Sequence, residues 1–453
     1  MAKTETKDYS LGQTQEISTT NFVDTKLKLY SAHSNVRGIP FIGDGMKQAH
    51  RKAIYGMLCR GENADKDTVE RLAARCCSDT DSHHGAGSME GTIVGLAQNF
   101  AGANNIPLIE GIGQFGSRLS KQPASARYIK AKLSPNFRKL FRKEDDLILK
   151  HHISNGDKIE PIYFIPLLPM SLVNGVEGMG TGHSTYILSY NPDDIKSAIQ
   201  QVLTGKTLTP GSLKPWFKGF NGSIEREDNG QIVISGDYRE EGGLQLRITE
   251  LPVGMQDDKF EDILKKLIDK DVIKDFVNSS DEEGFDFLIT APRATTAKSR
   301  EELLKTFKLI SRETENLTLW DTNGVLKRFS SVEEIITEFV EWRLARYEDR
   351  RQALINLTEE EIVWLDERIR FINFYLKNTE LFRNTGKKDL IALISDNEFS
   401  QPEKLLSMAI WSLTKDKIEE LQNELDSQVK YLESLQKDTP LKMYTRELNQ
   451  LTF

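Results

Sequence analysis

Apolar residues recur every three to four positions in three stretches near the N-terminus, at 45–58, 65–77 and 88–103. This spacing places apolar side chains on one face of a helix, so we expect three short amphipathic helices. A glycine-rich, basic and strand-like stretch follows them. Three helices followed by such strands are typical of a winged helix, which is a variant of the helix-turn-helix.

The pattern changes twice further along the chain. Between 187 and 330, alternating stretches such as "GGLQLRITELPV" predict strands, and "DKFEDILKKLIDKDVI" has helical spacing. From 332, more than forty residues run without Pro or Gly, and a second helix is expected at 414–436. Helices of this length predict an antiparallel coiled coil. The segment between them, 377–413, is expected to form a small helical knob that dimerises, since it buries little core alone.

The predicted fold class is therefore α+β and multidomain. The expected parts are a polar N-terminal arm without predicted elements (1–25), a winged-helix domain (26–186), a separate α+β domain (187–330) and a coiled coil carrying the knob (331–453).

Charge is distributed unevenly along the 453 residues. The formal net charge is −8, but residues 1–150 hold 22 basic and 16 acidic residues. Within them, 118–143 carries nine Lys and Arg side chains and no acid. A basic segment on an acidic chain fits a local phosphate-binding surface. A solvated basic face remains the alternative.

Several classes of protein are disfavoured. No run of about 18 apolar residues exists, so no membrane span is expected. The N-terminus lacks the apolar core of an export signal. The three cysteines, Cys59, Cys76 and Cys77, form neither a disulfide framework nor a C-x-x-C motif. We expect a protein of a reducing compartment.

The glycine-rich motifs do not predict a nucleotide site. "GIGQFG" at 111–116 is followed by neither a helix nor an acid about twenty residues on, as a dinucleotide fold requires. "GVEGMGTG" at 175–182 lacks the Gly-Lys-Ser/Thr of an ATP-binding loop. "DTD" at 79–81 and the pair His83–His84 lack further metal ligands nearby, so no metal site is expected.

Tyr128 stands in "PASARYIKAKLSPNF", between Arg127 and two lysines. One interpretation is a strand tyrosine with its ring packed inward. The other is a nucleophile that attacks a phosphodiester, because a phenol needs neighbouring cations to be activated and an arginine fork binds phosphate oxygens. The leaving group then needs a divalent ion. The chain offers no carboxylate cluster to hold one, which predicts a partner polypeptide.

Seven blocks of sequence resemble the breakage–reunion region of type IIA DNA topoisomerases. Three are "RGIPFIGDGMKQAHRKAIYGM" (37–57), "HHGAGSMEGTIVGLAQNFAGANNIPLIEGIGQFGSR" (83–118) and "ARYIKAKLS" (126–134), and four more lie between 172 and 421. The blocks occur in one order over most of the chain. The sequences of several blocks are similar to those of eukaryotic members. The chain is short, however, and in this it resembles phage members whose breakage–reunion part is a separate polypeptide.

The resemblance implies site residues at matching positions. Tyr128 would be the nucleophile, with Arg127 and His84 as further catalytic residues, and Met179 takes the place of an apolar wedge between base pairs. The implied DNA-binding residues are Arg37, Lys47, His50, Arg51, Lys52, His83, Arg118, Lys130, Lys132 and Met179. No residue of this chain is implied to bind a metal.

The resemblance also implies partners. Double-stranded DNA would be the substrate, a homodimer would form through the knob as C-gate, and 187–330 would be the tower domain. Mg²⁺ and ATP would be bound by a large partner subunit rather than by this chain. Relaxation and decatenation are the expected activities, in the cytoplasm, or in the host cytoplasm for a phage protein. The rival hypothesis is a non-enzymatic DNA tether built from a winged helix and a coiled coil.

Overall fold

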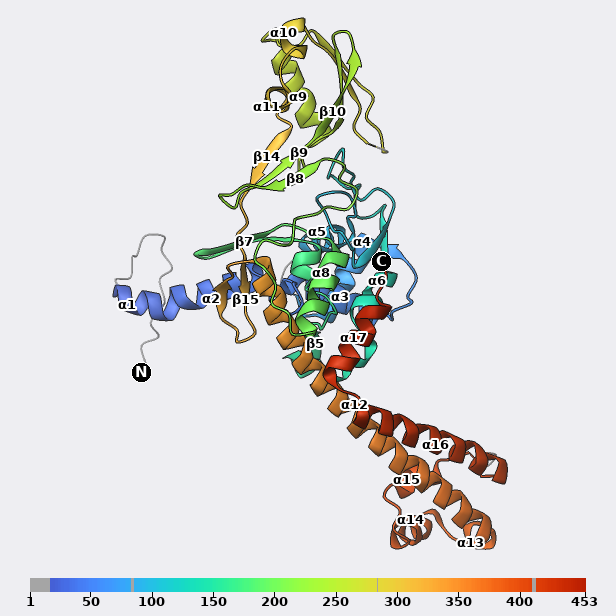
Figure 1. The fold of residues 1–453 in the computed structure, drawn as a ribbon. Helices are drawn as coiled ribbons and strands as arrows, with labels where there is room; N and C mark the ends of the chain where they lie inside the picture. The colour runs from blue at the N-terminus through green and yellow to red at the C-terminus, as the bar shows by residue number, and fades with distance from the viewer. Residues whose placement is uncertain (1–16, 83–84, 283, 410–412) are drawn as a thin grey trace. The chain divides into compact units, whose positions relative to one another are not determined.

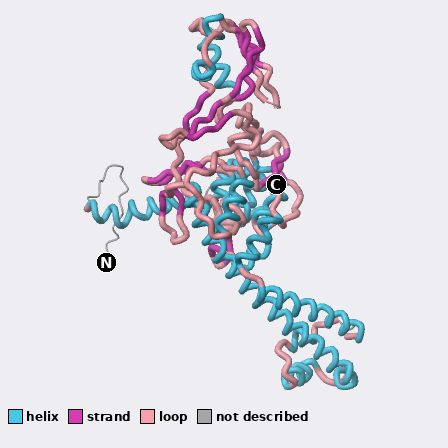
Figure 2. Tube along the Cα trace, viewed as in Figure 1, coloured by secondary structure: helices cyan, strands magenta, loops and turns pink. Residues whose placement is uncertain are grey.

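The computed structural model describes residues 17–82, 85–282, 284–409 and 413–453. Contacts divide the chain into two compact units. Unit 1 runs to Phe137 and resumes over His151–Phe339, and unit 2 consists of Arg138–Lys150 and Val340–Phe453. The chain mixes helices and strands (Figure 2). None of the helices in the described ranges is long and apolar enough to cross a membrane.

The three predicted helices of unit 1 are confirmed as α3 (Gln48–Cys59), α4 (Val69–Asp79) and α5 (Ala86–Ala97) (Figure 1). A three-stranded antiparallel sheet of order β1-β3-β2 accompanies them, formed by β1 (Asp67–Thr68), β2 (Ile109–Ile112) and β3 (Lys130–Leu133).

The expectation that the arm lacks regular structure up to residue 25 is wrong from Thr19 onward. Ser18 caps the chain there by accepting a hydrogen bond from the backbone of Asn21. The helical run that follows consists of α1 (Thr19–Phe22), the π-helical η1 (Val23–Leu27) and α2 (Lys28–Gly38).

Two β-hairpins and two helices complete the part of unit 1 before residue 204. The hairpins are β4 (His151–Ser154) with β5 (Asp157–Pro161), and β6 (Val176–Gly180) with β7 (His183–Ile187). The helices are α7 (Met170–Val173) and α8 (Pro192–Leu203).

Two antiparallel sheets confirm the strands expected after 187. The first has the order β10-β11-β13-β12, with β10 (Asp237–Gly242), β11 (Gln245–Glu250), β12 (Asp275–Asn278) and β13 (Phe287–Thr290). The second has the order β14-β9-β8, with β8 (Ser223–Arg226), β9 (Ile232–Ser235) and β14 (Ile310–Glu313). The remaining elements are α9 (Asp257–Ile268), α10 (Arg293–Thr296), α11 (Arg300–Thr306), β15 (Thr318–Trp320) and β16 (Leu326–Arg328).

Helix α9 packs its apolar face on the first sheet. Phe260 and Leu264 are fully buried against Phe287 and Ile289, and the rings of Phe260 and Phe287 lie 4.8 Å apart, edge to face. The helix predicted from the apolar spacing of 258–273 is confirmed. The spacing marks it because the sheet covers the apolar face of the helix.

The two long helices expected after residue 331 are present in unit 2. Helix α12 (Val332–Lys377) has 46 residues, and α16 (Lys415–Lys437) lies along its second half, with Leu421 packed among Leu365, Ile369 and Ile372 (Figure 1). The other helices are α6 (Pro135–Leu140), whose end enters unit 2, the 3₁₀ helix η2 (Lys143–Ile148), α13 (Thr379–Asn384), α14 (Lys387–Asp396), α15 (Pro402–Leu406) and α17 (Pro440–Gln450).

Between α12 and α16, the described residues form a small group of helices, α13, α14 and α15. Its core consists of Phe371, Ile394, Phe399 and Leu405, with the rings of Phe371 and Phe399 6.0 Å apart. Such a core joins α14 and α15 to the end of α12.

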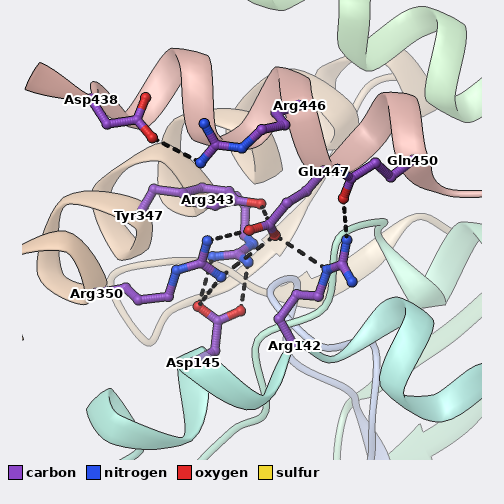
Figure 3. Close-up of polar contacts among 9 residues, drawn as sticks. All are labelled: Arg142, Asp145, Arg343, Tyr347, Arg350, Asp438, Arg446, Glu447 and Gln450. Carbon is purple, nitrogen blue, oxygen red and sulfur yellow. Dashed lines mark hydrogen bonds and ion pairs between the residues drawn. The ribbon is translucent and has the colours of Figure 1, made fainter. Parts of the chain in front are cut away.

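Two arginines of α12 are buried in unit 2, and carboxylates from two other elements balance them (Figure 3). Arg343 donates to Asp145 of η2 over 2.7 Å, and Arg350 pairs with Glu447 of α17. Tyr347 lies between them and donates its hydroxyl to Glu447 over 2.8 Å. Three elements distant in sequence are thereby held together.

The environment shifts the two carboxylates of this cluster in opposite directions. Burial outweighs the two arginines at Asp145 and raises the pKa of its carboxyl. Burial also opposes ionisation of Glu447, but Arg350 and Tyr347 together outweigh it, so the pKa of Glu447 lies below its ordinary value of 4.5. The stability that Glu447 contributes is therefore present above about pH 4.5 and is lost as the pH falls through its native pKa.

Replacement of Glu447 by alanine should destabilise unit 2 strongly. Arg350 would be left as a buried charge with one partner fewer, which costs about 3–5 kcal/mol in unfolding free energy. Thermal and denaturant unfolding of the chain measure this loss. The matched control is Glu433→Ala, because the pair between Lys437 and Glu433 is exposed (79% and 59%) and its loss should change stability by less than about 0.5 kcal/mol. Equal effects of the two substitutions would contradict a supporting role for the cluster.

Candidate nucleic-acid interface

Tyr128 lies in a turn immediately before β3, and its side chain is exposed (75%). The packed-strand interpretation of this tyrosine is therefore wrong. Its backbone donates to the carbonyl of Ser125, while α4 begins with backbone bonds from Glu70 to Ala126 and from Val69 to Ile129. Backbone contacts with the first turn of α4 thus fix the segment, and they leave the phenol hydroxyl accessible.

The cations beside Tyr128 differ in how far they are already paired. Arg127 and Lys130 are exposed, and neither forms an ion pair with a described residue. Lys132 faces Glu110 across the β2–β3 pairing, with their charged atoms 3.4 Å apart. Arg127 and Lys130 are therefore the cations available to a phosphate near the tyrosine.

The basic side chains of α3 and its entry are engaged within the protein. Arg51 is buried and forms a two-point pair with Asp44, at 2.7 and 2.9 Å. Lys47 donates to the carbonyl of Glu177 over 2.6 Å, and burial lowers the pKa of its ammonium group. Lys52 is engaged as well, with a backbone carbonyl and a buried carboxylate.

His50 and Arg118, two further predicted DNA-binding residues, have different surroundings. Burial, together with Lys47 and Arg51, lowers the pKa of His50 to about 4, so its imidazole is neutral at pH 7. Arg118 pairs with Glu250 over 3.2 Å and also donates to three backbone carbonyls between 251 and 255. Its guanidinium therefore joins the loop after β2 to the end of β11.

Met179 projects from the β6–β7 hairpin and is one of the most exposed apolar side chains (81%). The hairpin lies against the end of α2, where Asn35 donates to the carbonyl of Thr181 over 3.3 Å. A Cβ added to Gly38 would lie 2.0 Å from the carbonyl oxygen of Met179. Glycine at 38, which the sequence analysis missed, is what allows the helix and hairpin backbones to approach; no local sequence signal reveals this.

The loop between α4 and α5 borders a cavity of about 210 Å³. Arg37, Lys52, Ser82, Gly85 and Met89 are among the lining residues. His83 and His84, predicted for DNA binding and catalysis, lie outside the described residues. Tyr128 does not line this cavity; its segment lies at the start of α4, whereas the loop follows the end of that helix, about 16 Å away at 1.5 Å per residue. The candidate residues therefore do not all line one pocket.

Among the described residues, no group of three or more His, Cys, Asp and Glu side chains is placed to hold a metal ion.

Comparison with known proteins shows the family to which the chain belongs. Residues 37–450 match the family model for the A subunit of DNA gyrase/topoisomerase IV. The chain is 35% identical to mitochondrial DNA topoisomerase 2 of Dictyostelium discoideum and 32% identical to DNA topoisomerase 2 of Arabidopsis thaliana, covering 96% of this chain in both cases but 35% and 33% of those proteins. The chain therefore spans about a third of the length of these relatives.

The fold is similar to a solved structure as well. The DNA-binding, cleavage and re-ligation domain of Plasmodium falciparum topoisomerase II superposes with a TM-score of 0.89 at 34% identity, over 95% of this chain and 63% of that one. These matches define the class: a type IIA breakage–reunion fold. The chain belongs to the family of DNA gyrase and topoisomerase IV A subunits.

Substitution of Gly38 by alanine should weaken the packing of the β6–β7 hairpin against the end of α2. The added methyl group meets a backbone oxygen that cannot rotate away, so we expect unfolding to become easier by about 1–3 kcal/mol. Gly91→Ala on α5 is the control, since nothing lies within 4 Å of its added Cβ and helical Gly→Ala stabilises by about 0.4–1 kcal/mol. Thermal unfolding of both variants tests the opposite signs; a stable Gly38→Ala protein would exclude the close approach.

Lys130→Ala should reduce the salt dependence of DNA binding. One lost phosphate contact lowers the slope of log K against log salt concentration by about 1. Binding titrations at several salt concentrations measure the slope. Lys388→Ala, an exposed lysine on α14, should leave it unchanged, and an unchanged slope for Lys130→Ala would remove this lysine from the interface.

Proposed function

We propose that this chain is the DNA breakage–reunion subunit of a type IIA topoisomerase. The observation that carries the proposal is the exposed hydroxyl of Tyr128 beside Arg127 and Lys130, two cations without an ion-pair partner among the described residues. Membership of the gyrase and topoisomerase IV family supports it. The finer assignment of 26–186 as winged helix, 187–330 as tower and 377–413 as C-gate knob belongs to the same proposal.

The proposed reaction is a transesterification. The phenolic oxygen of Tyr128 loses its proton and attacks the phosphorus of a backbone phosphodiester. A bond between phosphorus and the tyrosine oxygen forms, the bond to one deoxyribose oxygen breaks, and a deoxyribose hydroxyl leaves. Because the ester is exchanged rather than hydrolysed, the reverse attack by that hydroxyl reseals the strand without consuming ATP in that step.

The chain's own groups position the DNA for this step. Arg127 offers a planar fork to the oxygens of the attacked phosphate, and Lys130 and Lys132 lie along the strand that follows. Met179 supplies an apolar wedge that can enter a base step and bend the duplex. A methionine is a softer wedge than a branched side chain because it has more rotatable bonds.

Cleavage also needs a divalent cation to stabilise charge on the leaving oxygen. The described residues of this chain offer no group of ligands that would hold such an ion. We place Mg²⁺ and ATP on a large partner subunit, in a complex with two copies of this chain joined through the knob. Each Tyr128 then cleaves one strand, and a second duplex passes through the break to give relaxation and decatenation.

Tyr128→Phe should abolish a covalent protein–DNA adduct. The phenyl ring keeps the shape but has no oxygen to attack phosphorus. The chain is combined with its large subunit, Mg²⁺ and plasmid DNA, the reaction is stopped with denaturant, and DNA-linked protein is measured. The control is Tyr431→Phe, a part-exposed tyrosine of unit 2, which should form adduct like the wild type.

Two other outcomes would count against the proposal. An adduct that survives in Tyr128→Phe would move the nucleophile to another residue. No adduct with the wild-type chain, under conditions where the partner hydrolyses ATP, would favour the non-enzymatic DNA tether.

A further inference from the structure

The β4–β5 hairpin has no assigned role in the proposed reaction, yet it is sharply defined. Asn155 and Gly156 form its turn with φ of 50° and 93°, and Asn-Gly is a favoured pair for a tight hairpin. Ser154 faces Asp157 across the turn. The hairpin rests on α3, where the hydroxyl of Tyr55 donates to the carbonyl of Lys158 over 3.4 Å.

The hairpin holds the loop that follows α4 at two points. Ser154 donates its hydroxyl to Asp81 Oδ2 over 2.5 Å. Glu160, whose side chain is 1% exposed, pairs with Lys52 at 3.0 Å, and the same ammonium group donates to the carbonyl of Thr80 over 2.6 Å. One of these contacts comes from β4 and the other from β5, so both strands of the hairpin hold the loop.

The loop itself is under conformational constraint. Asp81 has a φ of 45°, in the left-handed region where Asp, Asn and Gly are tolerated best. Thr80 is fully buried and donates its hydroxyl to the carbonyl of Cys76 over 2.6 Å. Beyond Asp81, Ser82 and Gly85 line the cavity together with Arg37. A shift of the loop would therefore change the wall of the candidate interface.

We propose that the β4–β5 hairpin positions residues 80–82, at the start of the loop after α4, for DNA cleavage, with Ser154 acting through Asp81 and Glu160 acting through Lys52. Ser154 and Glu160 are positioning residues, since neither lines the cavity with the candidate DNA-binding side chains. Lys52 then serves as an internal strut rather than as a direct phosphate contact. This inference rests on the proposed breakage–reunion function.

The chain allows the Ser154–Asp81 bond to be removed without backbone strain. Ser154→Ala removes the donor, and Asp81→Gly removes the acceptor while glycine keeps the positive φ. A double variant completes a cycle. Ser154→Thr and Asp81→Asn retain a hydroxyl donor and an oxygen acceptor. Ser330→Ala is the matched control, because Ser330 donates to Glu334 over 2.6 Å in a serine–carboxylate bond of the same chemistry outside this loop.

Measured in the complex with the large subunit, Mg²⁺ and DNA, each bond-removing variant should lower the equilibrium level of covalent adduct by about 3- to 10-fold. The double variant should lose no more than either single one, because both remove the same bond. DNA affinity and thermal stability should stay within about twofold and about 2 °C of the wild type. The two conservative variants should restore the adduct.

The outcomes separate this inference from the proposed function. If the wild-type chain forms adduct and Ser154→Ala matches it, the positioning role is wrong while the proposed function stands. Additive losses in the double variant, or equal losses in Ser330→Ala, would also overturn it. If the wild-type chain forms no adduct that Tyr128→Phe abolishes, it is the proposed function that fails.

Discussion

A single enclosed carboxylate, Asp44, fixes the geometry on which the candidate interface depends. It is fully buried and accepts four hydrogen bonds: two from the guanidinium of Arg51 and one each from the backbone of Met46 and Phe164. The pair joins the entry to α3, the helix itself and a segment more than a hundred residues later. Removing either charge would leave the other unpaired in the core, which is why such pairs tolerate little change. Because Arg51 points inward, the rotation of α3 about its axis is set. Lys47 at the N-cap then reaches β6, and Lys52 reaches the loop after α4.

The sequence predicted the elements whose signals are local. The three helices at 45–103, α9 and the two long helices of unit 2 have apolar residues at helical spacing, and packing of that face is what forms them. The segment around Tyr128 could also be singled out from the sequence as a candidate site, because its cations and small residues are neighbours in the chain. The sequence alone could not exclude the alternative, a packed strand tyrosine. Only the structure shows that this tyrosine lies in a turn that exposes its side chain.

The remaining features depend on contacts between residues far apart in the sequence, which the sequence alone does not predict. Lys52 meets Glu160 and Arg118 meets Leu251, pairs separated by 108 and 133 residues, so a basic side chain that reads as available turns out to be engaged. Arg343 and Arg350 of α12 are buried, because carboxylates from η2 and α17 pair with them. The sequence analysis did not foresee α17, which carries one of these carboxylates.

The proposed binding of DNA depends on local rather than overall charge. The chain carries a net charge of −8, so its overall charge opposes a polyanion and the attraction must come from local basic groups such as Arg127 and Lys130. At physiological ionic strength such fields decay over about 8 Å. A duplex would therefore gain little from long-range steering and would be held mainly when it lies close to these basic groups. Only a correctly oriented duplex would then stay bound, and wrongly oriented complexes would dissociate before the proposed cleavage of a strand.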